Sequence, residues 1–288
     1  MKTRFIAVGI AAGLAAAYAR AAEEPLPPHE KVLEKRITQA EAGDVAQQFE
    51  VGLAFCWSGN YPMAYHWLTI AATNGSVEAK QALGVMYEKG QFVQRDYKMA
   101  IALYQAAADA RYARGVRSLA VVFRDGLGVS NDLAKAFSLF RQAADLGLPE
   151  AWHDVAYMTI QGIGVEKNET KGIDFLKKAA TLGDQWAMES LGRLLFHGHL
   201  VHQDYAEARK WLQKAADRGC PEAQFLLAKI MMEGLDGAKT PGQGLHWLRI
   251  SAAQGFQPAM QALQSEKSGQ QQGGGYSPPA ARSTQPTP

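Results

Sequence analysis

The sequence predicts an all-α protein, a right-handed α-solenoid of about six helix-turn-helix repeats. Three observations support this prediction: a set of positions spaced by 36 residues and mostly glycine, an apolar residue eight positions after each of them, and a second glycine near the middle of each unit. The composition is that of a folded chain, since 47% of the 288 residues are hydrophobic and 20% are charged. Thirty basic and 28 acidic residues nearly balance, which argues against a nucleic-acid partner.

Residues 1–21 have the pattern of a signal peptide. Lys2 and Arg4 are basic, residues 5–17 form an apolar run, and Ala19-Arg20-Ala21 has the small-x-small pattern of a cleavage site. The run is shorter than the roughly 20 residues of a membrane-spanning helix, so an uncleaved anchor is the weaker alternative. We therefore expect an exported protein with no stable membrane insertion after cleavage.

The rest of the chain divides into three parts. Residues 22–42 form an N-terminal segment with an opening helix over residues 30–42, and residues 43–266 form the repeat domain, with a closing helix over residues 256–265. Residues 267–288 are mostly Gly, Gln, Pro, Ser and Thr with almost no apolar side chain, so we predict a disordered tail. A tether or a partner-binding strand is the alternative for this tail.

The 36-residue spacing predicts the first helix of each unit. The spaced positions, termed register positions below, are Gly75, Arg111, Gly147, Gly183, Gly219 and Gly255, preceded at 32 residues by Gly43. Eight residues after them stands an apolar row, Val51, Leu83, Leu119, Val155, Leu191, Leu227 and Leu263. The next residue is small in each of the first six units, for example Gly84 and Gly192, and a glycine inside a helix is costly unless another backbone approaches it closely. We therefore predict that helix packs tightly on helix.

A turn and a second helix complete the unit. The first helices end at glycines, Gly90, Gly126, Gly162, Gly198 and Gly234, which can adopt a left-handed conformation. Six residues later stand side chains that cap helices, Asp96, Asp132, Asn168, Asp204 and Thr240. The second helices then carry an apolar row, Trp67, Leu103, Leu139, Phe175, Trp211 and Trp247. Arg111 breaks the glycine rule, so we expect a locally altered helix end there.

These units resemble the Sel1-like repeat family, a relative of the tetratricopeptide repeats. The resemblance covers residues 43–255 and is clear in residues 78–108, which contain Leu83-Gly84, Tyr87, Gly90, Val93, Asp96 and Ala100. It implies a scaffold for protein-protein interaction and, for exported bacterial members, a role as an envelope adaptor, a host-interaction factor or an immunity protein that neutralises an effector. It implies no common reaction. Together with the signal peptide it predicts a bacterial protein of periplasmic or secreted location, and we expect no cofactor.

A partner protein is expected on the free side of the first helices, which lines the concave groove of a solenoid. Helical periodicity places the third, sixth, tenth, thirteenth and fourteenth residues after each register position on that side. The candidate groove residues are Phe49, Trp57, Arg114, Arg117, Arg124, His153, Tyr157, Trp186, Arg193, Phe196, Phe225 and Lys229. Aromatic and arginine side chains dominate binding energy at protein interfaces. For Phe49, Leu53 and Trp57, packing under the N-terminal helix is an equal alternative.

The arginines suggest what the partner carries. Arg114, Arg117 and Arg124 come from one unit, and guanidinium groups pair with carboxylates through two hydrogen bonds. We therefore expect one or more protein partners, with an acidic segment as the preferred ligand. If these arginines only bind, replacing Arg117 and Arg124 by glutamate weakens capture and leaves thermal stability nearly unchanged.

Three chemical alternatives are weaker. His197, His199 and His202 lie close in sequence, but no Cys or carboxylate at ligand spacing accompanies them, so we predict no metal site. Cys56 and Cys220 lie too far apart in a solenoid to form an intrachain disulfide, and Cys56 has only His66 near it as a base. A cysteine-rich branch of the family is associated with binding or hydrolysing β-lactams, and this is the alternative function. The chain has two cysteines in all and no Ser-x-x-Lys motif, so we predict no enzyme.

Overall fold

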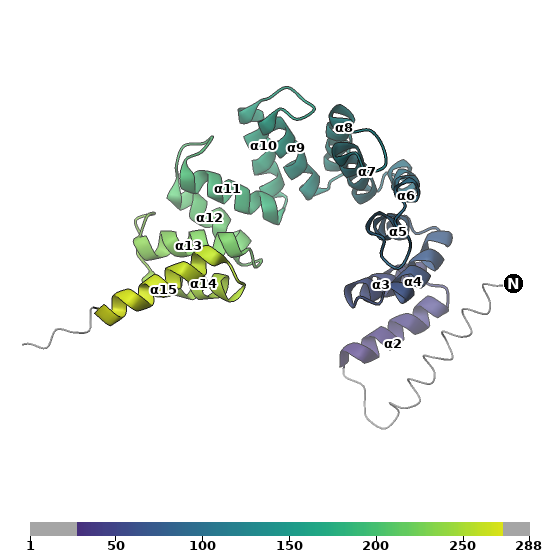
Figure 1. The fold of residues 1–288 in the computed structure, drawn as a ribbon, viewed down its shortest axis with the longest axis horizontal. Helices are drawn as coiled ribbons and strands as arrows, with labels where there is room; N and C mark the ends of the chain where they lie inside the picture. The colour runs from purple at the N-terminus through teal and green to yellow at the C-terminus, as the bar shows by residue number, and fades with distance from the viewer. Residues whose placement is uncertain (1–27, 273–288) are drawn as a thin grey trace, which may run out of the picture. The chain divides into compact units, whose positions relative to one another are not determined.

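The computed structural model describes residues 28–272, and within this range the chain is all-α, with fourteen helices. The predicted signal peptide, residues 1–21, and most of the predicted tail lie outside the described residues. The chain divides into two compact units, each made of several repeats: the first unit runs up to Gly115 and the second unit starts at Val116. Figure 1 labels the helices of both.

The first unit contains the opening helix and two helix pairs. The helices are α2 (Pro28–Glu41), α3 (Val45–Trp57), α4 (Tyr61–Thr73), α5 (Val77–Lys89) and α6 (Tyr97–Asp109). Each packs on the next along the chain from α2 to α6. The boundary between the units falls within α7 (Ala113–Asp125).

The second unit continues the same alternation. Its helices after α7 are α8 (Leu133–Asp145), α9 (Pro149–Gln161), α10 (Glu169–Thr181), α11 (Gln185–His197), α12 (Tyr205–Ala216), α13 (Pro221–Glu233), α14 (Pro241–Ala253) and α15 (Gln257–Gln272). Consecutive helices from α8 to α15 pack on each other, and α11 also contacts both α9 and α13. The helix α15 reaches Gln272, so the first six residues of the segment that was predicted to be disordered are helical.

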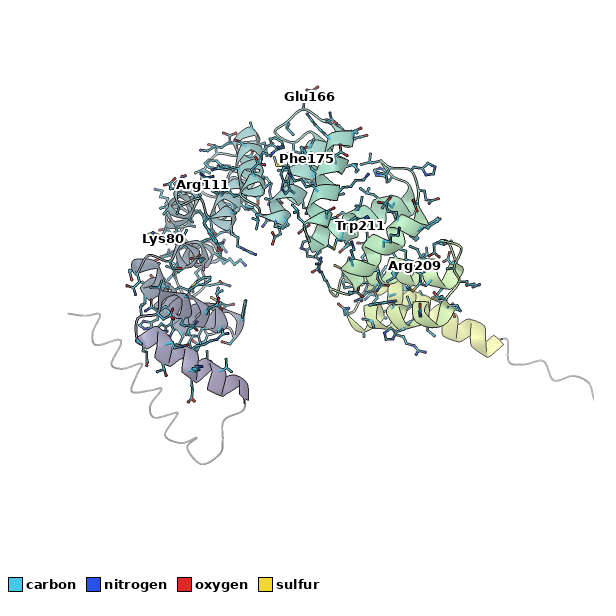
Figure 2. The ribbon with its side chains drawn as sticks, turned by 180° about the vertical axis from the view of Figure 1, so that it is seen from behind. Lys80, Arg111, Glu166, Phe175, Arg209 and Trp211 are labelled. Carbon is cyan, nitrogen blue, oxygen red and sulfur yellow. The ribbon has the colours of Figure 1, made fainter. Side chains whose placement is uncertain are left out.

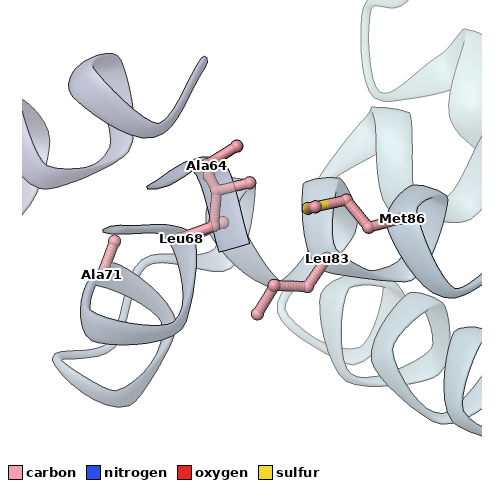
Figure 3. Packing of buried hydrophobic residues seen from close by; sticks show 6 residues of the cluster. Ala64, Leu68, Ala71, Leu83 and Met86 are labelled. Carbon is pink, nitrogen blue, oxygen red and sulfur yellow. The ribbon is translucent and has the colours of Figure 1, made fainter. Parts of the chain in front are cut away.

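Small residues let the helices of a pair approach closely, as predicted. A Cβ atom added to Gly84 on α5 would lie 2.5 Å from the ring of Tyr104 on α6, and one added to Gly192 on α11 would lie 2.7 Å from Leu212 on α12. Figure 3 shows a part of the core of the first unit, where Leu68 of α4 lies near Leu83 and Met86 of α5. Both Tyr104 and Leu212 are fully buried, so glycine at these positions makes room for a large apolar side chain.

Capping residues set the ends of the helices. The register glycines all have positive φ, from 83° at Gly255 to 101° at Gly183. Asp96, Asp132, Asn168 and Asp204 each accept a hydrogen bond from a backbone amide in the first turn of the second helix, as predicted. The prediction for Thr240 is wrong in part: it lies at the N-cap of α14, followed by Pro241, but its hydroxyl makes no capping hydrogen bond. Proline at the first helical position removes one of the amides that need a partner.

Arg111 adopts the conformation that glycine has at the equivalent positions. Its φ is +59°, and α6 ends at Asp109, 36 residues after the end of α4 and 36 before the end of α8. The expectation of an altered helix end at Arg111 is therefore wrong. The side chain, labelled in Figure 2, is exposed, so the cost of this conformation is the local one of Cβ against the backbone.

Candidate protein-binding surface

The predicted groove residues of the first unit have different environments. Phe49 is half-buried and packs against the core cluster that contains Leu68 and Leu83, so its role there is structural. Trp57, the last residue of α3, is 82% exposed and does not pack under the opening helix. Leu53 is half-buried, and Arg114 is exposed at the start of α7. Of these side chains, Trp57 is the large apolar one available to a ligand.

The arginines of α7 that lie in the second unit are already paired with carboxylates. Arg117 Nε lies 2.6 Å from Oδ2 of Asp154 on α9, and Arg124 donates to both carboxylate oxygens of Asp125, at 2.7 and 2.9 Å. The hydrogen bond from Arg124 lowers the pKa of Asp125 below its ordinary value, more than burial raises it. Two of the three guanidinium groups that were expected to attract an acidic partner therefore form pairs within the chain.

The first helices of the second unit present exposed aromatic side chains on one face. Tyr157 on α9 is 55% exposed, and Trp186 on α11 is 60% exposed. The helices α9, α11 and α13 lie side by side because α11 contacts both neighbours. His153 and Arg193 share this face, one turn before Tyr157 and two turns after Trp186. These residues form the predicted free side of the first helices.

A hollow of about 240 Å³ lies between α9 and α11, and three predicted residues line it. Its polar side is formed by His153, Tyr157 and Arg193 together with Gln161, Ser190 and His199. The apolar lining comes from Ile160, Leu176, Leu194 and Leu200. Arg193 has a loose ion pair with Glu222 of α13, at 3.7 Å, and remains 48% exposed. We name this space the α9–α11 hollow.

A second hollow of about 490 Å³ lies between α13 and α15, against α14. It is lined by the predicted residues Phe225 and Lys229, with Met232, Leu248 and Ala262 as further apolar residues. Phe225 is also half-buried, with its ring centroid 5.6 Å from that of Phe256. Lys239, Glu233 and Glu266 add charges at this space, which we name the α13–α15 hollow.

Phe196 corrects the predicted set, because it is not on the free surface. Only 6% of it is exposed, and its ring lies 5.4 Å from the ring of Tyr205 on α12. The ammonium group of Lys229 lies 5.6 Å from the ring centroid of Phe196. The thirteenth residue after a register position therefore points between the helices, and the helical-wheel criterion placed it on the wrong side.

Sequence reasoning missed most of the apolar lining. Leu200 belongs to the turn after α11 and has a φ of +63°, where the preceding repeat has Gly164 with a φ of +66°. A non-glycine residue at positive φ costs about 1 kcal/mol, so this turn places a large apolar side chain beside the α9–α11 hollow at a cost to stability. The sequence does not single out Leu200, because the equivalent position holds glycine in two other repeats, at Gly128 and Gly164, but phenylalanine at Phe92.

The histidines and cysteines were considered above as metal ligands and nucleophiles. Residues 28–272 contain no cluster of three His, Cys, Asp or Glu side chains that could hold a metal ion. Burial raises the pKa of Cys56, and burial chiefly raises the pKa of Cys220 to about 11. Both thiols are free, and Sγ of Cys220 accepts a hydrogen bond from Gln185 at 2.9 Å. Raised pKa values keep both thiols protonated, which makes them poor nucleophiles.

The comparison with protein families identifies the repeats. The Sel1 repeat model matches six segments, residues 50–76, 77–112, 114–148, 149–184, 187–220 and 221–256. The chain belongs to the Sel1 repeat family. It is an all-α Sel1-repeat solenoid protein, and the family places it among scaffolds for protein-protein interaction.

Solved structures of Sel1 repeat proteins resemble the chain. A Sel1 repeat protein from Oxalobacter formigenes is 29% identical, with a TM-score of 0.66 over 75% of this chain and 89% of that one. A protective antigen present in uropathogenic Escherichia coli strains is 28% identical, with a TM-score of 0.59 over 79% of this chain. The match spans only 57% of the length of that antigen.

A more distant solved structure shares the fold alone. An immunity protein from Pseudomonas aeruginosa is 20% identical, with a TM-score of 0.53 over 82% of this chain and 86% of that one. No curated protein matches the Sel1 repeat chain. Among the helices of residues 28–272, none is both long and apolar enough to cross a membrane.

Proposed function

We propose that this Sel1 repeat protein is exported and binds a partner protein on the free side of its first helices. The observation that carries the proposal is the grouping of exposed aromatic side chains with two hollows on that side of the second unit. Tyr157 lines the α9–α11 hollow, and Trp186 lies on the same face of α11 as Arg193. A partner that covers large aromatic side chains removes their apolar surface from water, and this burial favours binding.

The packing of the repeats does not require these side chains. Trp186 is 60% exposed, and α11 buries other residues, such as Leu191 and Leu195, in the core. An exposed tryptophan therefore adds little to folding. Its exposure on the face of α11 that also carries Arg193, a residue of the α9–α11 hollow, supports a role in binding.

Export is the second part of the proposal. It rests on the basic start, the apolar run and the cleavage pattern of residues 1–21. The expected location is the periplasm or the outside of a bacterial cell. Cell fractionation of the full chain, followed by N-terminal sequencing, tests this part. A mature protein that begins at Ala22 supports export, and a cytoplasmic chain that begins at Met1 contradicts it.

Three roles fit an exported protein-binding module: an envelope adaptor, a host-interaction factor and an immunity protein that neutralises an effector. The protective antigen among the relatives supports a role outside the cell, but the chain spans about half of that protein. We propose no reaction, because protonated thiols are poor nucleophiles and the family implies no common activity. Incubation with a chromogenic β-lactam tests the enzymatic alternative, and turnover at a constant rate would contradict the proposal.

A photocrosslinking experiment tests binding on this surface. A photoreactive amino acid replaces Tyr157, and a matched chain carries it at Ser138, an exposed residue of the second helix α8. We expect a crosslinked partner from position 157 and a much weaker product from position 138. Trp186→Ala should reduce the product from position 157. Equal crosslinking from both positions would contradict a specific surface.

A further inference from the structure

The α9–α11 and α13–α15 hollows are the same structural space, separated by two repeats. Ile160 in the first and Met232 in the second are both the thirteenth residue after a register position. Leu176 and Leu248 also correspond, at a separation of 72 residues, and so do Ser190 and Ala262. Each hollow thus lies between two consecutive first helices, against the second helix that separates them.

We call the space between two consecutive first helices a step. The step from α11 to α13, which lies between the two hollows, carries larger side chains at the same positions. Phe196 stands where the hollows have Ile160 and Met232, and Leu226 stands where they have Ser190 and Ala262. Both are buried, with 6% of Phe196 and 5% of Leu226 exposed. A phenylalanine and a leucine therefore occupy the volume that an isoleucine and a serine leave open one repeat earlier.

The step from α7 to α9 is occupied in another way. There the thirteenth residue is Arg124, and the seventh residue after the next register position is Asp154. Asp154 forms the short ion pair with Arg117 and is 12% exposed. The seventh position thus carries a small side chain at both hollows and a large or ion-paired one at the two occupied steps.

We propose that the two hollows bind one extended segment of the partner protein, which inserts a large apolar side chain into each. This inference rests on the function proposed above. First helices in contact pack with axes about 8–10 Å apart, so hollows two repeats apart are separated by about 16–20 Å. An extended chain covers that distance in five or six residues at about 3.3 Å each. Side chains of an extended chain point to the same side at even separations, which selects a separation of six residues.

Charge specifies the partner segment further. The titratable side chains lining the α9–α11 hollow are His153, Tyr157, Arg193 and His199, and no Asp or Glu lines it. The α13–α15 hollow has Lys229 and Lys239 beside Glu233 and Glu266, so its charges balance. Arg193 is only loosely paired with Glu222 and remains accessible. The segment should therefore carry an Asp or Glu next to the apolar residue that enters the α9–α11 hollow.

Selection from a phage-displayed library of random 12-residue peptides on the full chain tests the spacing. We expect enrichment of two large apolar residues six positions apart, with an acidic residue within two positions of one of them. Another fixed separation, or no preferred separation among peptides that bind, would overturn the two-hollow inference. If that binding is still lost in Trp186→Ala, the proposed function stands without the inference.

Filling each hollow gives the matched protein variants. Ser190→Leu and Ala262→Leu each introduce the residue that stands at the occupied step, Leu226, and Ser138→Leu makes the same change as Ser190→Leu at an exposed site of α8. We expect each filled hollow to weaken binding of the selected peptide by about tenfold or more, measured by fluorescence anisotropy, since one large apolar side chain loses its burial. Ser138→Leu should bind as the wild-type chain does. Unchanged affinity in both hollow variants would overturn the inference.

Changes in the peptide keep the test decisive if a variant folds poorly. Alanine at either of its two apolar positions should weaken binding to the wild-type chain by about tenfold, and alanine at an intervening position should not. Two further measurements test whether the chain itself fills the hollow. Sedimentation of the full chain without peptide shows whether it forms a dimer. A dimer that Ser190→Leu dissociates would show that a second copy fills the hollow. Peptide binding that appears only after removal of residues 273–288 would show that the chain's own C-terminal segment fills it, and either result overturns the inference.

Discussion

Arg117 on α7 donates a hydrogen bond to Asp154 on α9, with Nε and Oδ2 2.6 Å apart and the Asp154 side chain 12% exposed. The pair joins the first helices of two consecutive repeats. A surface arginine that was expected only to bind a ligand therefore also holds its own repeats together. This changes the expected effect of charge reversal at position 117.

Replacing Arg117 by glutamate should destabilise the chain. Glutamate would face the mostly buried carboxylate of Asp154, and loss of the pair together with repulsion should lower the free energy of unfolding by about 2 kcal/mol. Arg117→Asp combined with Asp154→Arg should recover part of this loss. Urea denaturation followed by the helix signal measures both variants. Unchanged stability in Arg117→Glu would show that the pair, like many exposed ion pairs, contributes nothing to the free energy of unfolding.

The pair between Arg209 and Asp236 should make stability depend on pH in the acid range. Burial alone would raise the pKa of Asp236, but hydrogen bonds from Arg209, at 2.6 Å, and from the Ala238 amide together lower it below its ordinary value. A carboxyl whose pKa is lower in the folded chain stabilises above its unfolded pKa, about 3.9, and loses this effect as pH falls through the folded value.

Asp236→Asn isolates this contribution. At pH 7 we expect a higher free energy of unfolding for the wild type than for the variant. This difference should shrink below about pH 4. Arg209 is labelled in Figure 2, on α12. Urea denaturation at a series of pH values measures the difference. A gap between the two proteins that stays constant from pH 7 to pH 3 would contradict the assignment.

Adding a methyl group at Gly84 should destabilise the chain. Its Cβ would lie 2.5 Å from the ring of Tyr104, which is fully buried, so Gly84→Ala should cost about 1–3 kcal/mol. Gly242 on α14 is the matched control, because a Cβ there has no heavy atom within 4 Å. Gly242→Ala should stabilise by up to about 1 kcal/mol through helix propensity. Thermal unfolding should move in opposite directions for the two variants, and a shift in the same direction would refute this account of the helix contact.

Arg111→Gly should stabilise the first unit. The left-handed conformation at φ +59° costs an arginine about 1–2 kcal/mol, while the greater freedom of glycine in the unfolded chain offsets part of the gain. A net increase of about 0.5 kcal/mol is expected in the free energy of unfolding. Arg111→Ala removes the same side chain but keeps a Cβ, so it should not stabilise. Equal stability in the two variants would show that backbone strain at position 111 is small.

The spacing of 36 residues predicted the helices because each feature behind it is local. The apolar row, the small residue after it and the capping residues act within one helix or one turn, and α5, α9, α11 and α13 all end one residue before a predicted glycine. Thr240 was mispredicted because threonine is a common capping residue, but its hydroxyl accepts no hydrogen bond from the first turn of α14.

The binding surface was harder to predict because it depends on side chains from different repeats. The partner of Arg117 lies 37 residues away, in the next repeat, and a helical wheel contains no such relation. Phe196 was placed on the free side, although its size and the small volume left by the helices bury it. Tyr157 and Trp186 were predicted correctly to be accessible, since no neighbouring helix covers their positions.

The contrast between Phe196 with Leu226 and Ile160 with Ser190 affects how such a protein can change over time. Two substitutions at one step can open or fill a hollow, while the capping residues and the glycines that fix the backbone stay as they are. Descendants of one ancestral sequence can therefore acquire different ligands through side-chain volume alone, provided that the facing positions of two neighbouring repeats change together.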